Sequence, residues 1–479
     1  MAHQTSIEYG KKAEFMSESS LISFRPYLLD PVPVTVVSGL PGAGKSELIR
    51  QMIEFLAQGA PPKKANLLDD AKLMKPDASC SHCGVTDALQ DEFKRQIREE
   101  CPDQFFVEVP IEVDPRMIMS SFPPEVQRQY QRREPGSRAR PTRPASLDAL
   151  VTVIDASTFV KRMNSQNSLA ADFPGLKTTE PEALNDATVD LLAASIETCD
   201  VLLVHRFESL SSDFMLSLQS CLRALQPRAK IVLAAEGKEA LWIPEVLDTR
   251  LFDLEKTEGS STWRQALKKC PPESRTAPGS EAGGWLPVEM WPGADPDLWC
   301  VGIFRRFRPF HPKRLADSLD HWTDDLLRTV GQIWLATDGG HSYHLGQIGP
   351  SPVFFHPDAP WAVTAPLSDQ LEMRREEPEL DRIWDSGHGD RFTEIVLIGP
   401  QAVIQEAVHE LDLCLLTDAE MTADWTKFDD PFFEEMQAQE KRERASISSE
   451  EGAGRRPPRE RANVPWLKLV PPSQPTDQF

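Results

Sequence analysis

Long apolar segments are missing from this sequence. No run approaches the roughly 20 apolar residues that a membrane-spanning helix requires, so we expect no transmembrane segment. Residues 1–20 are polar and mixed in charge, without the apolar core of a secretory signal peptide. The eight cysteines are scattered over 479 residues, which favours reduced thiols over a disulfide framework. Together these features predict a cytoplasmic protein.

An excess of positive charge is also missing, because the formal net charge is −22 at pH 7. Phosphate backbones and anionic membrane surfaces repel an acidic chain, so we expect neither a general nucleic-acid binder nor a membrane-surface protein. The local exception is a basic cluster of Arg305, Arg306, Arg308, Lys313 and Arg314. Nucleic-acid binding through this cluster is an alternative that the acidity of the whole chain disfavours.

The most informative stretch present is G-x-x-x-x-G-K-S at residues 39–46, called the phosphate loop below. An apolar β-branched run precedes it and an amphipathic pattern follows it, which is the strand–loop–helix context of a nucleotide-binding P-loop. Glycines let successive backbone N–H groups point into one concavity, and the following helix adds partial positive charge there. The alternative is a glycine-rich turn that binds nothing. The expected phosphate-binding residues are Gly39, Gly42, Ala43, Gly44, Lys45 and Ser46.

Apolar strands alternate with amphipathic helices through the first half of the chain. We expect strands at 33–38, 65–68, 105–109, 150–155, 200–205 and 230–234, and helices at 45–56, 87–100, 181–198 and 214–225. This alternation predicts an α/β domain whose parallel sheet is flanked by helices. Ligands bind at the carboxyl ends of such strands, where Gly39, Glu108 and His205 fall.

Composition divides the chain into five parts. We expect a flexible extension at 1–30, a nucleotide-binding domain at 31–257 with an insertion at about 121–147, a linker at 258–297, a small α+β domain at 298–433 and a disordered tail at 434–479. In the second domain the pattern predicts strands at 299–307, 332–336 and 393–399 and helices at 312–330 and 401–411. Within it, His341 and His344 are either metal ligands or part of a polar hairpin turn, and the turn is favoured.

The order of these motifs resembles the CobW-like metallochaperone GTPases, a family related to HypB and UreG. The resemblance rests on the phosphate loop, a C-x-x-C motif at 80–83, the strand ending V-T-V-I-D-A at 151–156, and the second domain. In that domain the matching segments are R-P-F-H-P-K-R-L at 308–315, G-D-R-F-T-E-I-V-L-I-G at 389–399 and C-L-L-T-D-A-E-M at 414–421. The resemblance implies a P-loop fold with a CobW C-terminal domain.

The family's C-x-C-C metal motif is Cys80-Ser81-His82-Cys83 in this chain. Two thiolates and an imidazole, from Cys80, His82 and Cys83, are good ligands for Zn²⁺ or Co²⁺ and leave a fourth position open. The alternative is two unpaired cysteines and a surface histidine in a loop.

Other family positions have changed. Lys45, Ser46 and Glu108 keep the catalytic and Mg²⁺ positions, and Asp114 and Pro115 keep their spacing, but Ile111 replaces a glycine that senses the γ-phosphate. The guanine-reading tetrad N-K-x-D is here His205-Arg206-Phe207-Glu208. His205, Arg206 and Glu208 therefore stand at the base-binding positions with altered reach, which weakens the expected selectivity for GTP.

Two functions follow from the resemblance. The first is a metal chaperone or insertase for zinc or cobalt that binds GTP, or ATP in its place, with Mg²⁺ and hydrolyses it slowly while passing metal to a client protein. The second is a degenerate pseudo-GTPase that acts as a protein-interaction or regulatory module. Hydrolysis above background that depends on Lys45 separates the two.

Overall fold

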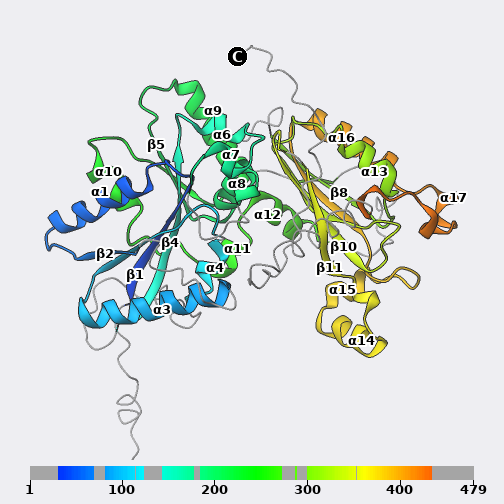
Figure 1. Ribbon diagram of the computed structural model, residues 1–479, viewed down its shortest axis with the longest axis horizontal. Coiled ribbons are helices and arrows are strands. Elements are labelled where there is room, and N and C mark those ends of the chain that lie inside the picture. Colours follow the sequence, from blue (N-terminus) through cyan, green and yellow to red (C-terminus); the bar gives the residue numbers. More distant parts are fainter. Residues whose placement is uncertain are drawn as a thin grey trace, which may run out of the picture.

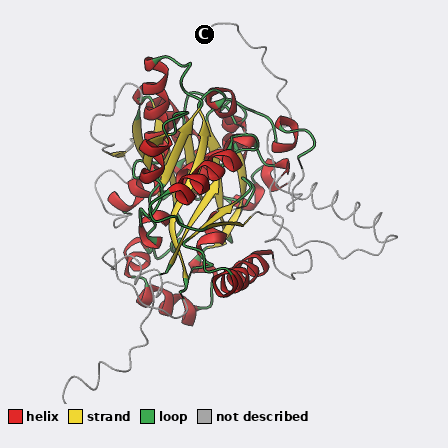
Figure 2. Ribbon diagram, turned by 90° about the vertical axis from the view of Figure 1, so that its left-hand side faces the viewer, coloured by secondary structure: helices red, strands yellow, loops and turns green. Residues whose placement is uncertain are grey.

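The structure is a computed structural model that describes residues 31–68, 81–113, 115–122, 143–176, 184–271, 286–288, 299–351 and 353–433. Figure 1 shows two sheets side by side with helices around and between them, and Figure 2, turned by 90°, shows helices in front of the strands. In the described part of the chain, no helix has both the length and the apolar character needed to cross a membrane.

The first sheet is parallel throughout, with the strand order β2-β3-β1-β4-β5-β6. Its strands are β1 (Val32–Ser38), β2 (Ala65–Leu68), β3 (Gln104–Glu108), β4 (Ala145–Asp155), β5 (Val201–His205) and β6 (Lys230–Leu233). The four central strands are almost entirely buried and rich in Val, Leu and Ile, as a sheet covered on both faces requires. The α/β fold predicted from the alternating pattern is confirmed.

Helices connect these strands. They are α1 (Lys45–Gln58), α3 (Ser81–Glu99), α4 (Pro115–Met119), α6 (Phe159–Met163), α7 (Leu169–Asp172), α8 (Thr188–Thr198), α9 (Ser212–Leu225), α10 (Glu239–Trp242), η4 (Ile243–Glu245), α11 (Leu254–Glu258) and α12 (Thr262–Lys269). Helix α1 buries Leu48, Ile49 and Met52, which share one face at helical spacing. This face fixes α1 on the sheet, so the phosphate loop between β1 and α1 is anchored at both ends.

The second sheet is antiparallel throughout, with the order β11-β10-β9-β12-β8-β7. Its strands are β7 (Leu286–Val288), β8 (Cys300–Arg306), β9 (Arg328–Ile333), β10 (His341–Ile348), β11 (Phe354–Pro360) and β12 (Thr393–Gly399). The helices of this half are α13 (Pro312–Leu319), η5 (Ala362–Thr364), α14 (Leu367–Glu376), α15 (Pro378–Ile383), α16 (Gln401–Cys414), α17 (Asp418–Met421) and η6 (Trp425–Lys427). The predicted α+β character of this half is confirmed.

Alternation along the strands divides the buried side chains of the second sheet between two layers. Phe304, Ile395 and Leu397 pack under α13 and α16, whereas Val301 and Val396 belong to a buried cluster shared with the first sheet. Helices α8 and α12 lie between the sheets, and α8 contacts both β4 and β10 (Figure 1). The two halves of the chain are therefore joined by a common apolar core.

Several predicted boundaries differ from the structure. The helix predicted at 181–198 begins at Thr188, and α3 begins at Ser81 rather than at residue 87. Strand β4 starts at Ala145, inside the stretch predicted as an insertion at 121–147. Helix α12 lies within the stretch predicted as the linker 258–297, and its Ala266 is buried.

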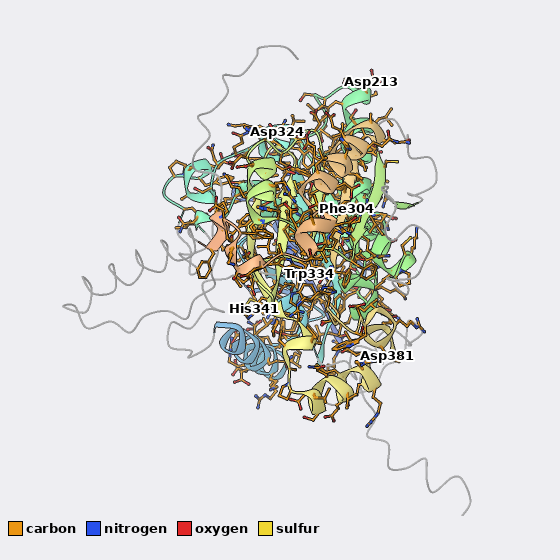
Figure 3. The ribbon with its side chains drawn as sticks, turned by 90° about the vertical axis from the view of Figure 1, so that its right-hand side faces the viewer. Asp213, Phe304, Asp324, Trp334, His341 and Asp381 are labelled. Carbon is orange, nitrogen blue, oxygen red and sulfur yellow. The ribbon has the colours of Figure 1, made fainter. Side chains whose placement is uncertain are left out.

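Two predictions for the second half are wrong. The helix predicted at 312–330 ends at Leu319, and residues 328–333 form the internal strand β9. His341 and His344 both lie in strand β10, so neither is in a hairpin turn. His341 lies at the exposed start of the strand (Figure 3), whereas His344 is packed beside His356 of β11, with ring centroids 5.3 Å apart. The predicted extension at 1–30 and tail at 434–479 lie outside the described residues.

Candidate nucleotide site

The phosphate loop has a backbone conformation that demands glycine. Gly39, Gly42 and Gly44 have φ angles of 147°, 74° and 90°, which L-residues with a side chain rarely adopt. A Cβ on Gly39 would lie 2.8 Å from the carbonyl oxygen of Val153, so β4 packs directly against the loop. A Cβ on Gly42 would have no atom within 4 Å, so the backbone there faces open space.

Helix α1 starts immediately after the loop. Its N-cap is Gly44, which supplies no side-chain hydrogen bond to the first turn. The N–H groups at a helix N-terminus carry partial positive charge and are a favourable place for an anion. The loop and helix thus have the arrangement predicted for binding phosphates.

Three predicted residues meet at this end of the sheet. Lys45 Nζ donates to the Gly39 carbonyl at 2.8 Å, which holds the ammonium group against the loop. The Ser46 hydroxyl donates to Glu108 Oε1 at 2.9 Å. Because β3 pairs with β1 in parallel, with Glu108 beside Val37, the sheet itself brings this carboxylate to the start of α1. A hydroxyl and a carboxylate oxygen are both suitable ligands for Mg²⁺.

The first two residues of the altered tetrad contact the loop directly. His205 Nε2 donates to the Ala43 carbonyl, and Arg206 Nη1 donates to the Gly42 carbonyl at 3.2 Å. In a trans peptide the N–H points opposite to the C=O, so the N–H of Gly44 points away from His205. A Cβ on Gly44 would lie 2.6 Å from His205 Cε1. The imidazole therefore supports the loop from outside and requires glycine at this position.

An ion pair completes this support. Arg206 Nη1 lies 2.7 Å from Asp155 Oδ2 at the end of β4. Burial alone would raise the pKa of Asp155, but hydrogen bonds from Ser157 and Arg206 outweigh it, and its pKa is lowered. Burial lowers the pKa of His205. Arg206 has a left-handed φ of 54°, a strained conformation that often occurs at functional sites.

The fourth tetrad position, Glu208, is exposed beyond the end of β5. Its Oε1 accepts a hydrogen bond from the backbone N–H of Glu236 at 3.2 Å, in the loop that follows β6. Hydrogen bonds from its own backbone N–H and from that of Glu236 lower its pKa. Glu208 is therefore an anionic acceptor beside a backbone donor, the two kinds of group that can read the edge of a base.

Ile111 does not project into solvent. Its side chain is 4% exposed and belongs to the same buried cluster as Leu40 and Ala43 of the phosphate loop. The side chain at the position of the expected glycine thus packs into the core beneath the loop. Asp114, which follows it in the motif, lies outside the described residues.

The predicted metal motif is described only in part. Cys80 lies outside the described residues, and His82 and Cys83 are placed as backbone in the first turn of α3, where their side chains are not described. Among the side chains that the structure describes, no group of three or more His, Cys, Asp or Glu residues could hold a metal ion. The side chains of Cys80, His82 and Cys83 are not among those described, so the metal site stays a prediction.

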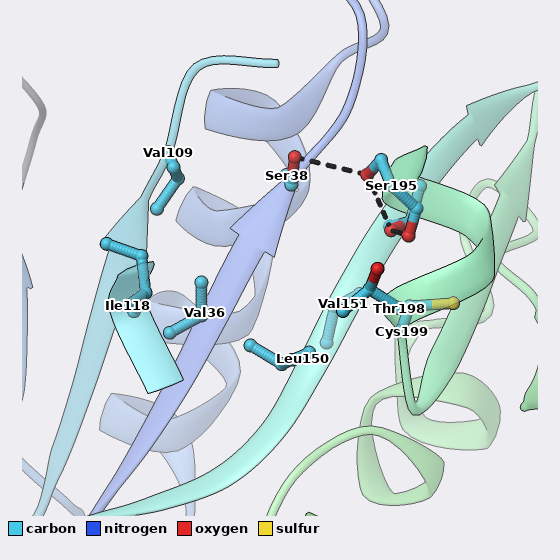
Figure 4. A pocket seen from close by; sticks show the side chains of 10 residues that line it. Val36, Ser38, Val109, Ile118, Leu150, Val151, Ser195, Thr198 and Cys199 are labelled. Atoms are coloured by element: carbon cyan, nitrogen blue, oxygen red, sulfur yellow. Dashed lines mark hydrogen bonds between the residues drawn. The ribbon is translucent and has the colours of Figure 1, made fainter. Parts of the chain in front are cut away.

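A buried cluster of hydroxyl groups lies beneath the phosphate loop and was not predicted. Ser195 of α8 donates its Oγ hydrogen to Ser38 Oγ at 3.3 Å (Figure 4). Thr152 Oγ1 lies 2.9 Å from Ser195 Oγ. The same residues line a small, mostly apolar cavity together with Val36, Leu150 and Cys199. Serine in a helix gives no sequence signal for such a contact, since it is usually solvated.

The basic cluster of the second domain is engaged in internal ion pairs. Arg305 pairs with Glu394, Arg306 with Asp412, Arg308 with Asp418, Lys313 with Asp317 and Arg314 with Glu420. These cations are held by carboxylates of their own domain, which gives the cluster a structural role.

Known proteins resemble both the C-terminal domain and most of the chain as a whole. Residues 300–415 match the family described as Cobalamin synthesis protein cobW C-terminal domain. The chain is 23% identical over 422 residues to zinc-regulated GTPase metalloprotein activator 1 of Dictyostelium discoideum, covering 82% of this chain and 81% of the relative. It is 30% identical over 142 residues to a zinc chaperone of Mycobacterium tuberculosis, covering 29% of this chain and 35% of that protein. The resemblance to the CobW-like family is confirmed.

Two solved structures are also similar. The Zn(II)-bound YjiA GTPase from E. coli is 14% identical with a TM-score of 0.30, over 81% of this chain and 100% of that chain. The hydrogenase maturation factor HypB from Archaeoglobus fulgidus is 13% identical with a TM-score of 0.24, over 44% of this chain and 84% of that one.

Proposed function

We propose that this chain, which resembles the CobW-like metallochaperone GTPases and carries a CobW C-terminal domain at residues 300–415, is a nucleotide-dependent metal chaperone or insertase. It binds GTP, or ATP in its place, together with Mg²⁺, and hydrolyses it slowly. Its cargo is zinc or cobalt, which it passes to a metal-requiring client protein in the cytoplasm. Relatives named as a zinc-regulated GTPase metalloprotein activator and a zinc chaperone support this proposal.

The proposal rests on the shape of the phosphate loop and on the side chains of Lys45, Ser46 and Glu108 that lie at it. Lys45 supplies a cation at the loop, and the uncapped start of α1 supplies N–H donors for phosphate oxygens. The residues fit Mg²⁺, because Ser46 Oγ and Glu108 Oε1 are two oxygen ligands 2.9 Å apart. When bound, the ion neutralises charge that develops on the phosphates.

The substituted tetrad keeps a supporting role in this proposal. His205 and Arg206 hold the Ala43 and Gly42 carbonyls, so the loop keeps its curl without the family's Asn and Lys. Glu208 offers a carboxylate to the base, but its longer side chain is already bonded to the N–H of Glu236. That bond fixes the direction of a carboxylate that is one methylene longer than the family's Asp, and the altered reach reduces selectivity for guanine relative to the family.

The cargo site is proposed on chemistry alone. Thiolates of Cys80 and Cys83 and the imidazole of His82 suit Zn²⁺ or Co²⁺, and an incomplete ligand shell suits transfer. Because α3 begins at Ser81, the motif spans the N-terminus of that helix. A helix N-terminus favours thiolate over thiol, which aids metal capture near neutral pH.

Phosphate release from GTP tests the proposal with the full-length chain. We expect slow Mg²⁺-dependent hydrolysis that Lys45→Ala abolishes and that Lys63→Ala, an exposed control outside the loop, leaves unchanged. Slow turnover is expected because, among the described residues, the carboxylate bonded to Ser46 is that of Glu108, which is assigned to Mg²⁺ rather than to a general base. GTP binding without turnover, and without any effect on zinc affinity, would instead support the degenerate pseudo-GTPase alternative.

A further inference from the structure

Helix α8 contacts both β4 of the first sheet and β10 of the second (Figure 1). Its sequence matches none of the motifs described above. Three of its polar side chains, those of Asp190, Ser195 and Glu197, are nevertheless buried or bonded at the two interfaces.

On the side of the first sheet, α8 reaches the strand that enters the phosphate loop. Ser195 Oγ donates to Ser38 Oγ at 3.3 Å, and Thr152 Oγ1 donates to the Ser195 carbonyl at 2.9 Å. Ser38 directly precedes Gly39, whose carbonyl holds Lys45 Nζ. A displacement of the loop on phosphate binding therefore acts on Ser195 through one residue.

On the side of the second sheet, α8 ends in a buried ion pair. Arg328, the first residue of β9, donates from Nε to Glu197 Oε1 at 2.9 Å, and both side chains are about one-tenth exposed. Trp263 Nε1 of α12 donates to Glu197 Oε2 at 3.0 Å, and Arg328 Nη1 donates to the Gln347 carbonyl of β10 at 3.2 Å. Such a buried, multiply bonded pair has one narrow geometry and transmits movement between the elements that carry it.

Asp190 lies on the same face of α8 as Glu197, toward the second half of the chain. Asp190 is seven residues before Glu197, and its Oδ1 accepts a hydrogen bond from Ser351 Oγ at 3.5 Å. Burial raises the pKa of Asp190 to about 7, with Arg328 opposing the rise and Asp186 and Glu197 adding to it. The buried pair of Glu197 and Arg328 and the partly buried Asp190 thus form an interface whose charge balance depends on the position of α8.

The packing around Ser195 is incomplete. The small cavity lined by Ser38, Thr152, Ser195 and Cys199 lies where the end of α8 meets β1 and β4 (Figure 4). Side chains that line a void make fewer contacts, so this joint resists displacement less than a fully packed one. The other end of the linkage, at Glu197 and Arg328, is tightly bonded.

We propose that α8 couples occupancy of the phosphate loop to the C-terminal sheet, with Ser195 as the positioning residue at the loop and the Glu197–Arg328 pair as the connection to β9 and β10. This coupling rests on the proposed function, since it needs a nucleotide at the loop. It gives the C-terminal domain a part in the nucleotide cycle. Since linkage is reciprocal, whatever binds the C-terminal sheet changes nucleotide affinity by the same factor.

Amide hydrogen exchange of the full-length chain, with and without GTP and Mg²⁺ at saturation, tests the proposal. We expect GTP to slow exchange in residues 39–46 and also in β9 and β10, the latter by about fivefold, at the lower end of typical allosteric coupling. The test variant is Glu197→Gln combined with Arg328→Met, which removes the pair without leaving one buried charge alone. The control is Arg306→Met combined with Asp412→Asn, an equivalent pair on the α16 face of the same sheet.

In the test variant, GTP should still slow amide exchange at residues 39–46 but no longer in β9 and β10. In the control variant, GTP should slow exchange in both regions. Ser195→Ala breaks the linkage at its other end and should give the same result, which covers the case in which the double variant does not fold. Protection of β9 and β10 that persists in Ser195→Ala and the double variant overturns the coupling alone. Absence of GTP protection at residues 39–46 in the unmodified chain overturns the proposed function as well.

Discussion

The hydroxyl of Ser46 donates to the carboxylate of Glu108, with Ser46 Oγ and Glu108 Oε1 2.9 Å apart. These residues are 62 positions apart in sequence, and only the parallel pairing of β1 with β3 brings them together. The pair marks the place where Mg²⁺ is expected to bind beside the phosphates of a nucleotide.

Glu108→Gln tests this expected metal position. The amide removes the negative charge while keeping a similar shape, so Mg²⁺-dependent GTP affinity should fall by about 10–100-fold, the usual effect of losing a metal-supporting group. Titration of GTP with Mg²⁺ and with EDTA measures the change. Because the loop itself is untouched, the affinity measured in EDTA should be the same for both proteins; an equal loss in both conditions would contradict the assignment.

His205 should matter for the loop rather than for the base. His205→Ala removes the donor to the Ala43 carbonyl and should weaken GTP and ATP binding alike, by about 1 kcal/mol or roughly fivefold. His205→Gln places an amide Nε2 at a reach similar to that of the imidazole Nε2 and should recover most of the affinity. A variant that changed the ratio of GTP to ATP affinity would assign His205 to base recognition instead.

His344 should make the fold sensitive to acid. Burial, together with the neighbouring His356 and Arg328, lowers the pKa of His344 to about 4. The unfolded chain takes up this proton near the ordinary pKa of 6.5, so stability is lost as the pH falls below 6.5 and the loss is complete near pH 4. The loss should reach about 3 kcal/mol.

His344→Gln removes this proton uptake. Urea unfolding of the variant between pH 7 and pH 4 should show a shallower decline in the free energy of unfolding than the unmodified chain. His341→Gln, at the exposed start of the same strand, is the control and should leave the slope unchanged.

Asp190 should make the folded state less stable as the pH rises, the opposite of the effect of His344. Its pKa is raised to about 7 in the folded chain, chiefly by burial, so the folded state holds a proton that the unfolded state releases near pH 3.8. Stability is therefore lost as the pH rises from about 4 through 7, by up to about 4 kcal/mol. Asp190→Asn should be more stable than the unmodified chain at pH 8, with a difference that shrinks toward pH 5. Urea unfolding of both proteins at pH 8 and at pH 5 checks the sign of this difference in stability.

The sequence predicted the shape of the phosphate loop well because the chemistry of the loop is local; that a nucleotide binds there stays a prediction. The phosphate loop needs glycines, a lysine and a serine at fixed spacing, and Gly39, Gly44 and Lys45 take the backbone conformation and contacts that this spacing implies. The carboxyl-end position of Glu108 and His205 followed from the alternation of strands and helices alone. These features depend on near neighbours or on the parallel sheet, so they could be predicted.

Features set by tertiary packing could not be predicted. Trp322, Leu326 and Val330 follow helical spacing, yet the antiparallel pairing of β9 with β10 and β12 makes Val330 part of a strand. Glu197 and Arg328 are 131 residues apart, and Asp190 and Ser195 resemble ordinary polar residues of a surface helix. Nothing in their spacing signals that α8 lies between two sheets.

The most direct measurement is calorimetric titration of the full chain with GTP in Mg²⁺, with and without one equivalent of Zn²⁺, and with Lys45→Ala and Cys83→Ser as controls. The account predicts GTP binding that Lys45→Ala abolishes, and an affinity that zinc changes about fivefold or more in the unmodified chain but not in Cys83→Ser. GTP affinity that is the same with and without zinc would contradict a chaperone whose nucleotide and cargo sites are coupled.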